Sequence, residues 1–374
     1  MRIGLGLLHV HRRIGGTWNY IDNVLRALAR YDDVNTYVGY VNEESRELIP
    51  DKGNFHVHHL NINPRAPIRR IACENTVLQG LAKYHGIDCM HWFGNIHAFL
   101  SLIPNVVTVH DISLYKDAHT FSLPRGFYWR LMFRHTVKNC RVLLPVSEAT
   151  AEELEVVLGA DRAKMILTPF PMDERFRPVP PDRVEEFRRK YGLPDQFWLY
   201  VAHTYKHKNH LGLLEAYRNL KARSLNTWPL VLRGDPSDAE SRITDAIREF
   251  GLENDVIRFP RIDYFDLPLL YSCASALVFP SFFEGCGLPV LEAMACGCPV
   301  IASDIPPMRE FAGQAACFFD PADVHDIERS MAELERDETL RHALTEKGLE
   351  QVGYFDSATV ARDIMKAYEI AARP

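Results

Sequence analysis

Two carboxylates, Glu284 and Glu292, lie eight residues apart in the segment 279–304, which has the pattern of a strand, a loop, a helix and a second strand. We predict the helix from about Val290 to Ala295, so Pro289 falls near its first turn, where a missing N–H is tolerated. The free N–H groups of such a helix start attract anions. Carboxylates next to a phosphate site suit the hydroxyl groups of the same ligand. This combination describes a nucleotide-sugar pocket.

The elements around these acids are those of a parallel α/β unit. Ala276–Phe279 is a short apolar run, as a strand covered on both faces requires. Gly297 ends the predicted helix, and the next strand begins at Pro299. A plain strand-to-helix turn that carries two exposed acids is the alternative interpretation.

The whole stretch PSFFEGCGLPVLEAMACGCPVIASD closely resembles the donor-site signature of glycosyltransferase family 4, the retaining enzymes of GT-B fold. The resemblance implies that Glu284 lies beside the transferred sugar and that Glu292 binds the ribose of the nucleotide. It adds the loop residues to the expected donor site: Gly285, Gly287, Leu288 and Pro289. Cys286 stands where the family usually has a larger residue, often Phe, so the shape of the sugar subsite is left open.

A basic loop after the strand at Trp198 resembles the family's second donor contact. The resemblance implies that Lys208 reaches the donor diphosphate and takes part in catalysis. Many members also carry an arginine four or five residues earlier, where this chain has His203 and Thr204. Lys206 and Arg233 are the candidate replacements, and Arg261 and Ile262 are expected to border the base.

In the first half of the chain, residues 1–10 form a predicted strand that is followed by Gly15, Gly16 and an amphipathic helix to about Tyr31. This layout lets backbone N–H groups approach a phosphate, although the glycines also suit a tight turn alone. A later strand ends in His110-Asp111. By resemblance, His110 faces the reacting sugar; the alternative is a histidine bonded within its own loop.

The length of 374 residues favours two domains. The resemblance implies a GT-B architecture of two Rossmann-like, doubly wound parallel-sheet domains with a cleft between them. We expect an acceptor-binding domain at 1–170, completed by a C-terminal helix within 357–374. A Pro-rich linker at 171–194 then leads to a donor-binding domain at 195–356.

Two basic segments raise the question of anionic partners. Residues 61–70 form an irregular basic stretch before a predicted helix from about Ile71 to Tyr84, either simply exposed or in contact with an anionic acceptor. From Tyr115 to Arg141, aromatic and basic residues alternate. Such a helix can lie on an anionic membrane, or pack on the core with a solvated basic edge.

Composition bounds the remaining possibilities. The net charge of −6, with only a slight basic excess in the first half, does not suit nucleic acid. No apolar run suits a membrane span or a signal peptide, and the eight scattered cysteines suggest reduced thiols. We therefore expect a cytoplasmic protein. If the aromatic helix binds lipid, we expect this protein to lie at the inner face of a membrane. His56, His58 and His59 alternate along a strand, which is a poor metal site, and no metal or other cofactor is expected.

The resemblance implies retaining transfer of a hexose from a nucleotide-diphosphate sugar, of the GDP-mannose or UDP-glucose type, to a sugar hydroxyl of a lipid-linked or polysaccharide acceptor. Attack from the leaving-group face needs no carboxylate nucleophile. A nucleotide-sugar epimerase of GT-B-like fold and a catalytically silent GT-B partner protein are the alternatives. The sequence does not identify the sugar or the base of the donor. It also does not identify the acceptor, its linkage or the oligomeric state.

Overall fold

The computed structural model describes residues 1–12, 16–116, 123–224 and 227–373. The chain divides into two compact units. Unit 1 comprises Met1–Pro171 and Phe355–Pro374, and unit 2 comprises Met172–Tyr354. Each unit has its own sheet and its own core, and each is described by itself below.

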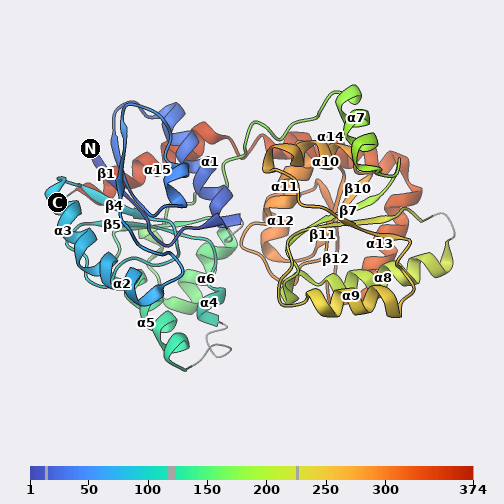
Figure 1. Cartoon of the computed structure of the whole chain (residues 1–374), viewed down its shortest axis with the longest axis horizontal. Coiled ribbons are helices and arrows are strands. Elements are labelled where there is room, and N and C mark those ends of the chain that lie inside the picture. Colours follow the sequence, from blue (N-terminus) through green and yellow to red (C-terminus); the bar gives the residue numbers. More distant parts are fainter. Residues whose placement is uncertain (13–15, 117–122, 225–226, 374) are drawn as a thin grey trace. The chain divides into compact units, whose positions relative to one another are not determined.

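Unit 1 is built on a six-stranded sheet in the order β3-β2-β1-β4-β5-β6, in which every pairing is parallel (Figure 1). Apart from the edge strand β3, which is mostly exposed, these short apolar strands are buried along almost their whole length, as strands with helices on both faces must be. Their bounds are β1 Arg2–Leu7, β2 Thr36–Val41, β3 Phe55–His59, β4 Cys89–Trp92, β5 Asn105–Val109 and β6 Val142–Pro145.

Seven helices of unit 1 concern the arguments below: α1 Gly16–Tyr31, α2 Pro67–Asn75, α3 Val77–Tyr84, α4 Ser113–Lys116, α5 Leu123–Asn139, α6 Glu148–Leu158 and α15 Ser357–Ala372. The C-terminal α15 packs against α1 and the strands β4 to β6. Its buried Tyr368 hydroxyl lies 2.8 Å from Nδ1 of His91, which β4 presents on that face of the sheet.

The predicted boundary between the irregular segment 61–70 and a helix from Ile71 is wrong. A helix starts four residues earlier, at Pro67, because proline is favoured in the first helical turn. This first helix ends at Asn75, and α3 follows after Thr76, whose backbone has left the helical region. Arg70 and Glu74 consequently share one helix face, four residues apart.

Unit 2 repeats the arrangement of unit 1, with a parallel sheet in the order β12-β11-β10-β7-β8-β9. Counted from its own first strand, each sheet has the order 3-2-1-4-5-6, the doubly wound Rossmann order. The strands of unit 2 are β7 Trp198–Val201, β8 Leu230–Arg233, β9 Val256–Phe259, β10 Ala276–Phe279, β11 Val300–Ser303 and β12 Ala316–Phe319.

The helices of unit 2 cover its sheet: α7 Pro181–Tyr191, α8 His210–Arg223, α9 Glu240–Glu249, α10 Leu267–Cys273, α11 Leu288–Ala295, α12 Pro306–Ala312, α13 Val324–Arg336 and α14 Glu338–Val352. Residues 171–194, expected to be a linker, contain α7, which packs on α10. Pro181 opens this helix, and Gly192 closes it in the left-handed conformation.

The strand order fixes where ligands can gather in each unit. In an open parallel sheet, the crevice lies at the carboxyl ends of the two strands where the order reverses. These strands are β1 and β4 in unit 1, and β7 and β10 in unit 2. His9 follows β1, whereas Lys208 and Glu284 follow β7 and β10 respectively.

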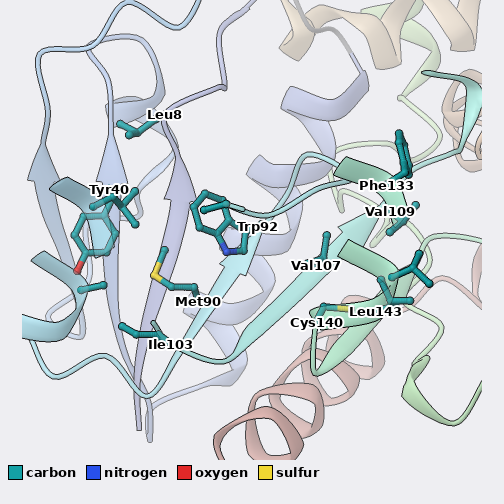
Figure 2. Close-up of a cluster of buried hydrophobic side chains, with 14 of the residues drawn as sticks. Leu8, Tyr40, Met90, Trp92, Ile103, Val107, Val109, Phe133, Cys140 and Leu143 are labelled. Carbon is teal, nitrogen blue, oxygen red and sulfur yellow. The ribbon is translucent and has the colours of Figure 1, made fainter. Parts of the chain in front are cut away.

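One buried cluster of unit 1 joins its sheet to the helices α2, α3, α5 and α6 (Figure 2). Residues two apart on a strand share a face, so β4 and β5 each contribute two side chains to the same layer. Each fully buried apolar side chain of this size stabilises the fold by roughly 1.5–3 kcal/mol. The layer includes Tyr40, Met90, Trp92, Val107, Val109, Phe133 and Leu143.

No helix in the part of the chain that the structure describes is long and apolar enough to span a bilayer. All eight cysteines are free thiols, and no cluster of His, Cys, Asp and Glu in the described ranges has the arrangement of a metal site.

Candidate functional site

The loop between β10 and α11 carries Glu284. The helix begins at Leu288, two residues before the predicted start, and Gly287 precedes it with a φ of +63°. This left-handed conformation favours glycine, and a Cβ here would also displace the Met308 side chain, whose Cε would lie 2.0 Å away. The predicted Pro289 lies in the first turn, as expected.

Lys208 and Glu284 form an ion pair, with side chains that are only 18% and 11% exposed. The main chain fixes both loops. The Tyr200 hydroxyl donates to the Lys208 carbonyl at 2.5 Å, and the Phe282 N–H donates to the His207 carbonyl at 2.9 Å. The loops after β7 and β10 are therefore joined at the point where the strand order reverses.

Glu292 is buried inside α11, with 3% of its surface exposed. Tyr271 donates to one carboxyl oxygen at 2.7 Å, and Tyr264 donates to the other at 3.2 Å. Burial raises the pKa of Glu292 to about 7, against the opposing effect of these hydrogen bonds and of the Arg233 charge, while Asp173 raises it further. A carboxylate has about four lone-pair positions, so it can still accept from two ligand hydroxyls.

The carboxylates of Glu284 and Glu292 both influence the pKa of the Cys286 thiol. Burial raises its pKa to about 12, and the charges of Glu284 and Glu292 both add to the increase, whereas a hydrogen bond with the backbone of Leu288 opposes it. Both carboxylates thus act on one partly exposed thiol just before α11.

Arg233, at the end of β8, is near enough to Glu292 to lower the pKa of that carboxyl. One terminal nitrogen donates to the Ile262 carbonyl at 3.4 Å, and the buried Nε has no partner. By contrast, Lys206 and Arg261 are exposed side chains, and Arg261 lies 3.7 Å from Asp235. Of the three basic candidates, Arg233 is the one beside Glu292.

His203 and Thr204, where an arginine is common, bond the neighbouring loop instead. The Asp235 N–H donates to Nδ1 of His203 at 3.0 Å, and the Ser237 N–H donates to Oγ1 of Thr204 at 2.6 Å. Thr204 is fully buried. These side chains have a structural partner within unit 2.

No sequence pattern pointed to the two tyrosines that hold Glu292, or to Asp173 and Arg175. The guanidinium of Arg175 lies 5.2 Å from the Tyr264 ring and pairs with Asp173. Tyr264 and Tyr271 are seven residues apart across a short helix, and a spacing of that kind is common in ordinary core helices. Their common partner is revealed only by the tertiary structure.

In unit 1, His110 follows β5. Its Nε2 lies 2.9 Å from the Phe93 carbonyl, and its backbone N–H donates to Asn95 at 2.7 Å. The ring lies edge-on to Tyr20 of α1, and burial lowers the pKa of the imidazole. A carbonyl can only accept, so Nε2 carries the hydrogen and Nδ1 carries the lone pair.

Of the two predicted glycines, Gly16 lies at the start of α1 in unit 1. Gly16 is the first residue of α1, and nothing lies within 4 Å of a Cβ built there, so packing within unit 1 does not require glycine. Gly15 lies outside the described residues.

A cavity of about 640 Å³ opens at the carboxyl end of the sheet of unit 1. It is within the size range of small-molecule sites, and all of its lining belongs to unit 1. Loops after β1, β4 and β5 contribute, as do α2 and α5; among the lining residues are His9, His97, His110, Arg70, Glu74, Trp92 and Trp129.

Two family models match the chain in succession. The model for glycosyltransferase family 4 matches residues 14–176, and the model for group 1 glycosyl transferases matches residues 183–351. The chain belongs to glycosyltransferase family 4. It is therefore a glycosyltransferase by family, with the GT-B fold that the sequence predicted.

Several relatives are named as mannosyltransferases of O-antigen chains. The O-antigen chain mannosyltransferase B of Escherichia coli is 28% identical over 266 residues, 71% of this chain and 70% of that protein. The serotype-specific mannosyltransferase WbdA of Escherichia coli is 36% identical over 183 residues, which cover 48% of this chain but 22% of WbdA. A solved glycosyltransferase from Rickettsia africae has a TM-score of 0.75 at 18% identity, and the match covers 99% of this chain and 98% of that one, which shows the fold.

The structure thus brings one part of the predicted donor set together within unit 2. Lys208 contacts Glu284, and Arg233 lies between Ile262 and Glu292 in the same unit. Gly285 to Pro289 form the loop and first turn that connect the two acids. His110 and Gly16 belong to unit 1.

Proposed function

We propose that this family 4 member is a retaining hexosyltransferase that uses a nucleotide-diphosphate sugar, of the GDP-mannose or UDP-glucose type. The observation that carries the proposal is the contact of Lys208 with Glu284 at the strand-order reversal of unit 2, with Glu292 in the following helix. One cation and two acids there match the needs of a diphosphate, a sugar and a ribose. Two relatives named as mannosyltransferases favour mannose as the sugar.

In the proposed reaction, the bond between the anomeric carbon and the diphosphate breaks as an acceptor hydroxyl attacks from the same face. The hydroxyl proton passes to a phosphate oxygen of the leaving group. Lys208 and the start of α11 stabilise the charge that builds on the diphosphate, and Glu284 stabilises the positive charge on the sugar. No step is assigned to a metal ion.

The test is release of nucleoside diphosphate from GDP-mannose and UDP-glucose, measured with and without a polyprenyl-linked or polysaccharide acceptor in the cytoplasmic pH range. We expect release to depend on the acceptor, with a new glycosidic bond of retained configuration by NMR. Acceptor-independent rearrangement of the sugar would instead indicate an epimerase. No turnover of any donor would indicate a silent partner protein.

We assign the ribose of the donor to Glu292, which leads to a pH dependence. Because burial raises its pKa to about 7, the carboxyl is mostly protonated below that pH and can then accept fewer hydroxyls. The affinity for nucleoside diphosphate should therefore rise between about pH 6 and pH 8.

Calorimetric titration of wild type and Glu292→Gln across this range isolates the effect, since ionisation of the ligand is common to both. The variant should bind roughly 10- to 100-fold more weakly at pH 8, the value of hydrogen bonds to a charged group. Parallel pH profiles of the two proteins would remove Glu292 from the ribose site.

We also propose that unit 1 contacts an anionic membrane from which it takes a lipid-linked acceptor. The residues Phe99, Leu100 and Leu102, in the loop before β5, are 47–69% exposed, and Phe127 of α5 is 70% exposed. Phe99 stacks on His135 of α5 at 4.4 Å, which places this loop beside the helix. The α5 sequence contains four basic residues and no acid, a composition suited to anionic headgroups.

Flotation with liposomes tests this membrane contact. Recovery should be at least severalfold higher with anionic than with neutral lipid, and the double change Leu100→Ser and Phe127→Ser should abolish the difference. Val156→Ser on α6, at a position 84% exposed, is the matched control and should float like wild type. Equal recovery with both lipids would refute the contact.

A further inference from the structure

The cavity of unit 1 contains buried nitrogen atoms that have no partner. Nε2 of His9, Nε2 of His97 and Nε of Arg70 are all buried without a hydrogen bond, and all three residues line the cavity. Buried polar groups in native proteins are nearly always bonded, so three such atoms around one cavity indicate a ligand that supplies partners.

The tautomer of His97 shows which partner is missing. Its Nδ1 lies 2.6 Å from the Ala98 carbonyl, an acceptor, so Nδ1 carries the hydrogen. Burial lowers the pKa of this imidazole to about 4, which leaves the ring neutral at pH 7. The unpartnered Nε2 is therefore a hydrogen-bond acceptor. Only 3% of His97 is exposed, and the residue lines the cavity, so a ligand held there can supply the donor.

His110 also lines the cavity and is a second neutral imidazole. Its hydrogen is on Nε2, bonded to the Phe93 carbonyl, and burial lowers its pKa, so Nδ1 holds a lone pair. A ligand that satisfies two neutral imidazole acceptors needs several O–H donors. Sugars provide several hydroxyls on one small ring.

The charged side chains of the cavity are two of each sign, and burial raises the pKa of Glu74 to about 7 against the Arg70 charge, so these charges balance above that pH. Arg70 and Glu74 lie 3.5 Å apart on one face of α2, with side chains 19% and 11% exposed. Arg125 and Asp111 also line the cavity and carry opposite charges. An anionic ligand would be attracted by Arg70 but repelled by the adjacent Glu74. An uncharged ligand avoids this repulsion.

Aromatic side chains form much of the remaining lining. Trp92, Trp129, Tyr128 and Phe99 contribute from β4, the following loop and α5. A flat apolar face beside a few fixed polar atoms is the usual composition of a small-molecule site. It also suits a pyranose ring, which has an apolar C–H face and a hydroxylated edge.

We propose that this cavity binds an uncharged hexoside unit of the acceptor, and that His97 selects it by accepting a hydrogen bond from one of its hydroxyls. The term acceptor rests on the proposed glycosyl transfer, whereas the binding of the hexoside does not. The Arg70–Glu74 pair then disfavours acidic sugars.

Binding is measured by saturation-transfer NMR without any donor, with methyl glycosides of mannose, glucose and galactose and with the matching uronides, which differ only by a carboxylate at C6. At least one neutral hexoside should bind, and its uronide should bind several times more weakly. His97→Phe should weaken binding about fivefold to tenfold, as expected for one hydrogen bond.

His135→Phe is the matched control. His135 also has a buried Nε2 without a partner, and its ring lies 5.1 Å from that of His97, but it does not line the cavity. Its replacement should leave the affinity within about twofold of wild type. An equal loss in both variants, or no binding of any neutral hexoside, would overturn the proposal.

Glu74→Gln provides a test by gain of binding. It removes the negative partner of Arg70 at nearly constant volume, so the uronide should now bind at least as tightly as the hexoside. Unchanged preference for the hexoside would contradict the role of the ion pair. Because no donor is present, hexoside binding without turnover would refute the transferase proposal alone, and turnover without hexoside binding would refute this inference alone.

Discussion

Replacement of Glu284 by Gln is expected to lower kcat by roughly 100-fold or more while leaving the affinity for free nucleoside diphosphate at least unchanged. The carboxylate is proposed to stabilise positive charge on the departing sugar, and loss of one such preorganised group typically costs a factor of about 100 to 1,000. The side chain also neutralises Lys208 in the unliganded protein. Its removal frees that ammonium group for the diphosphate.

Steady-state kinetics with a donor and acceptor, together with calorimetry for the diphosphate alone, separates the two effects. Asp255→Asn is the matched control because Asp255 also pairs with a lysine, Lys221, at 2.6 Å and is 29% exposed in the same unit. That variant should keep its turnover within about twofold. Full activity of Glu284→Gln, or a parallel loss of diphosphate affinity, would contradict the role.

The parts of the site that could be predicted are those encoded locally. Glu284, Gly287 and Glu292 lie within one strand-loop-helix unit, so their spacing alone limits how far apart they can be. Lys208 is 76 residues from Glu284 in sequence, yet the family's strand order brings β7 beside β10 and the two loops together. Resemblance supplied that connection.

The parts that could not be predicted depend on tertiary partners or on exact helix boundaries. Tyr264 and Tyr271 gain their meaning only from Glu292, which no local pattern links to them. The basic segment 61–70 was interpreted without Glu74 because the helix was expected to begin at Ile71. Once α2 begins at Pro67, Arg70 and Glu74 pair across one turn, so the charge of Arg70 has a partner in its own helix.

The tertiary structure also separates the two interpretations of α5, the helix in which aromatic and basic residues alternate. Phe133 of α5 is fully buried in the core of unit 1, whereas Phe127 is 70% exposed. The alternative interpretations of core packing and membrane contact therefore apply to different faces of one helix. Sequence alternation could not separate them, because both faces contain aromatic residues.

Lys208→Met should have the second large effect, and a different one. The diphosphate loses its direct cation both before and during the reaction, so its affinity and kcat should both decrease, with kcat lower by roughly 100- to 1,000-fold. Glu284, 11% exposed, is left without its counter-ion. A stability loss of about 1–3 kcal/mol is expected, between the values for exposed and fully buried pairs.

The double variant Lys208→Met and Glu284→Gln separates stability from catalysis. Since it removes both charges, thermal unfolding should return close to that of wild type, while turnover should stay as low as in the worse single variant. If the double variant recovers activity together with stability, the single variants lost turnover because their folded state was less stable, and not because they bound the donor poorly. If instead only stability returns, Lys208 and Glu284 both act on the donor. In the free protein these two side chains neutralise each other, and they separate when the substrate binds.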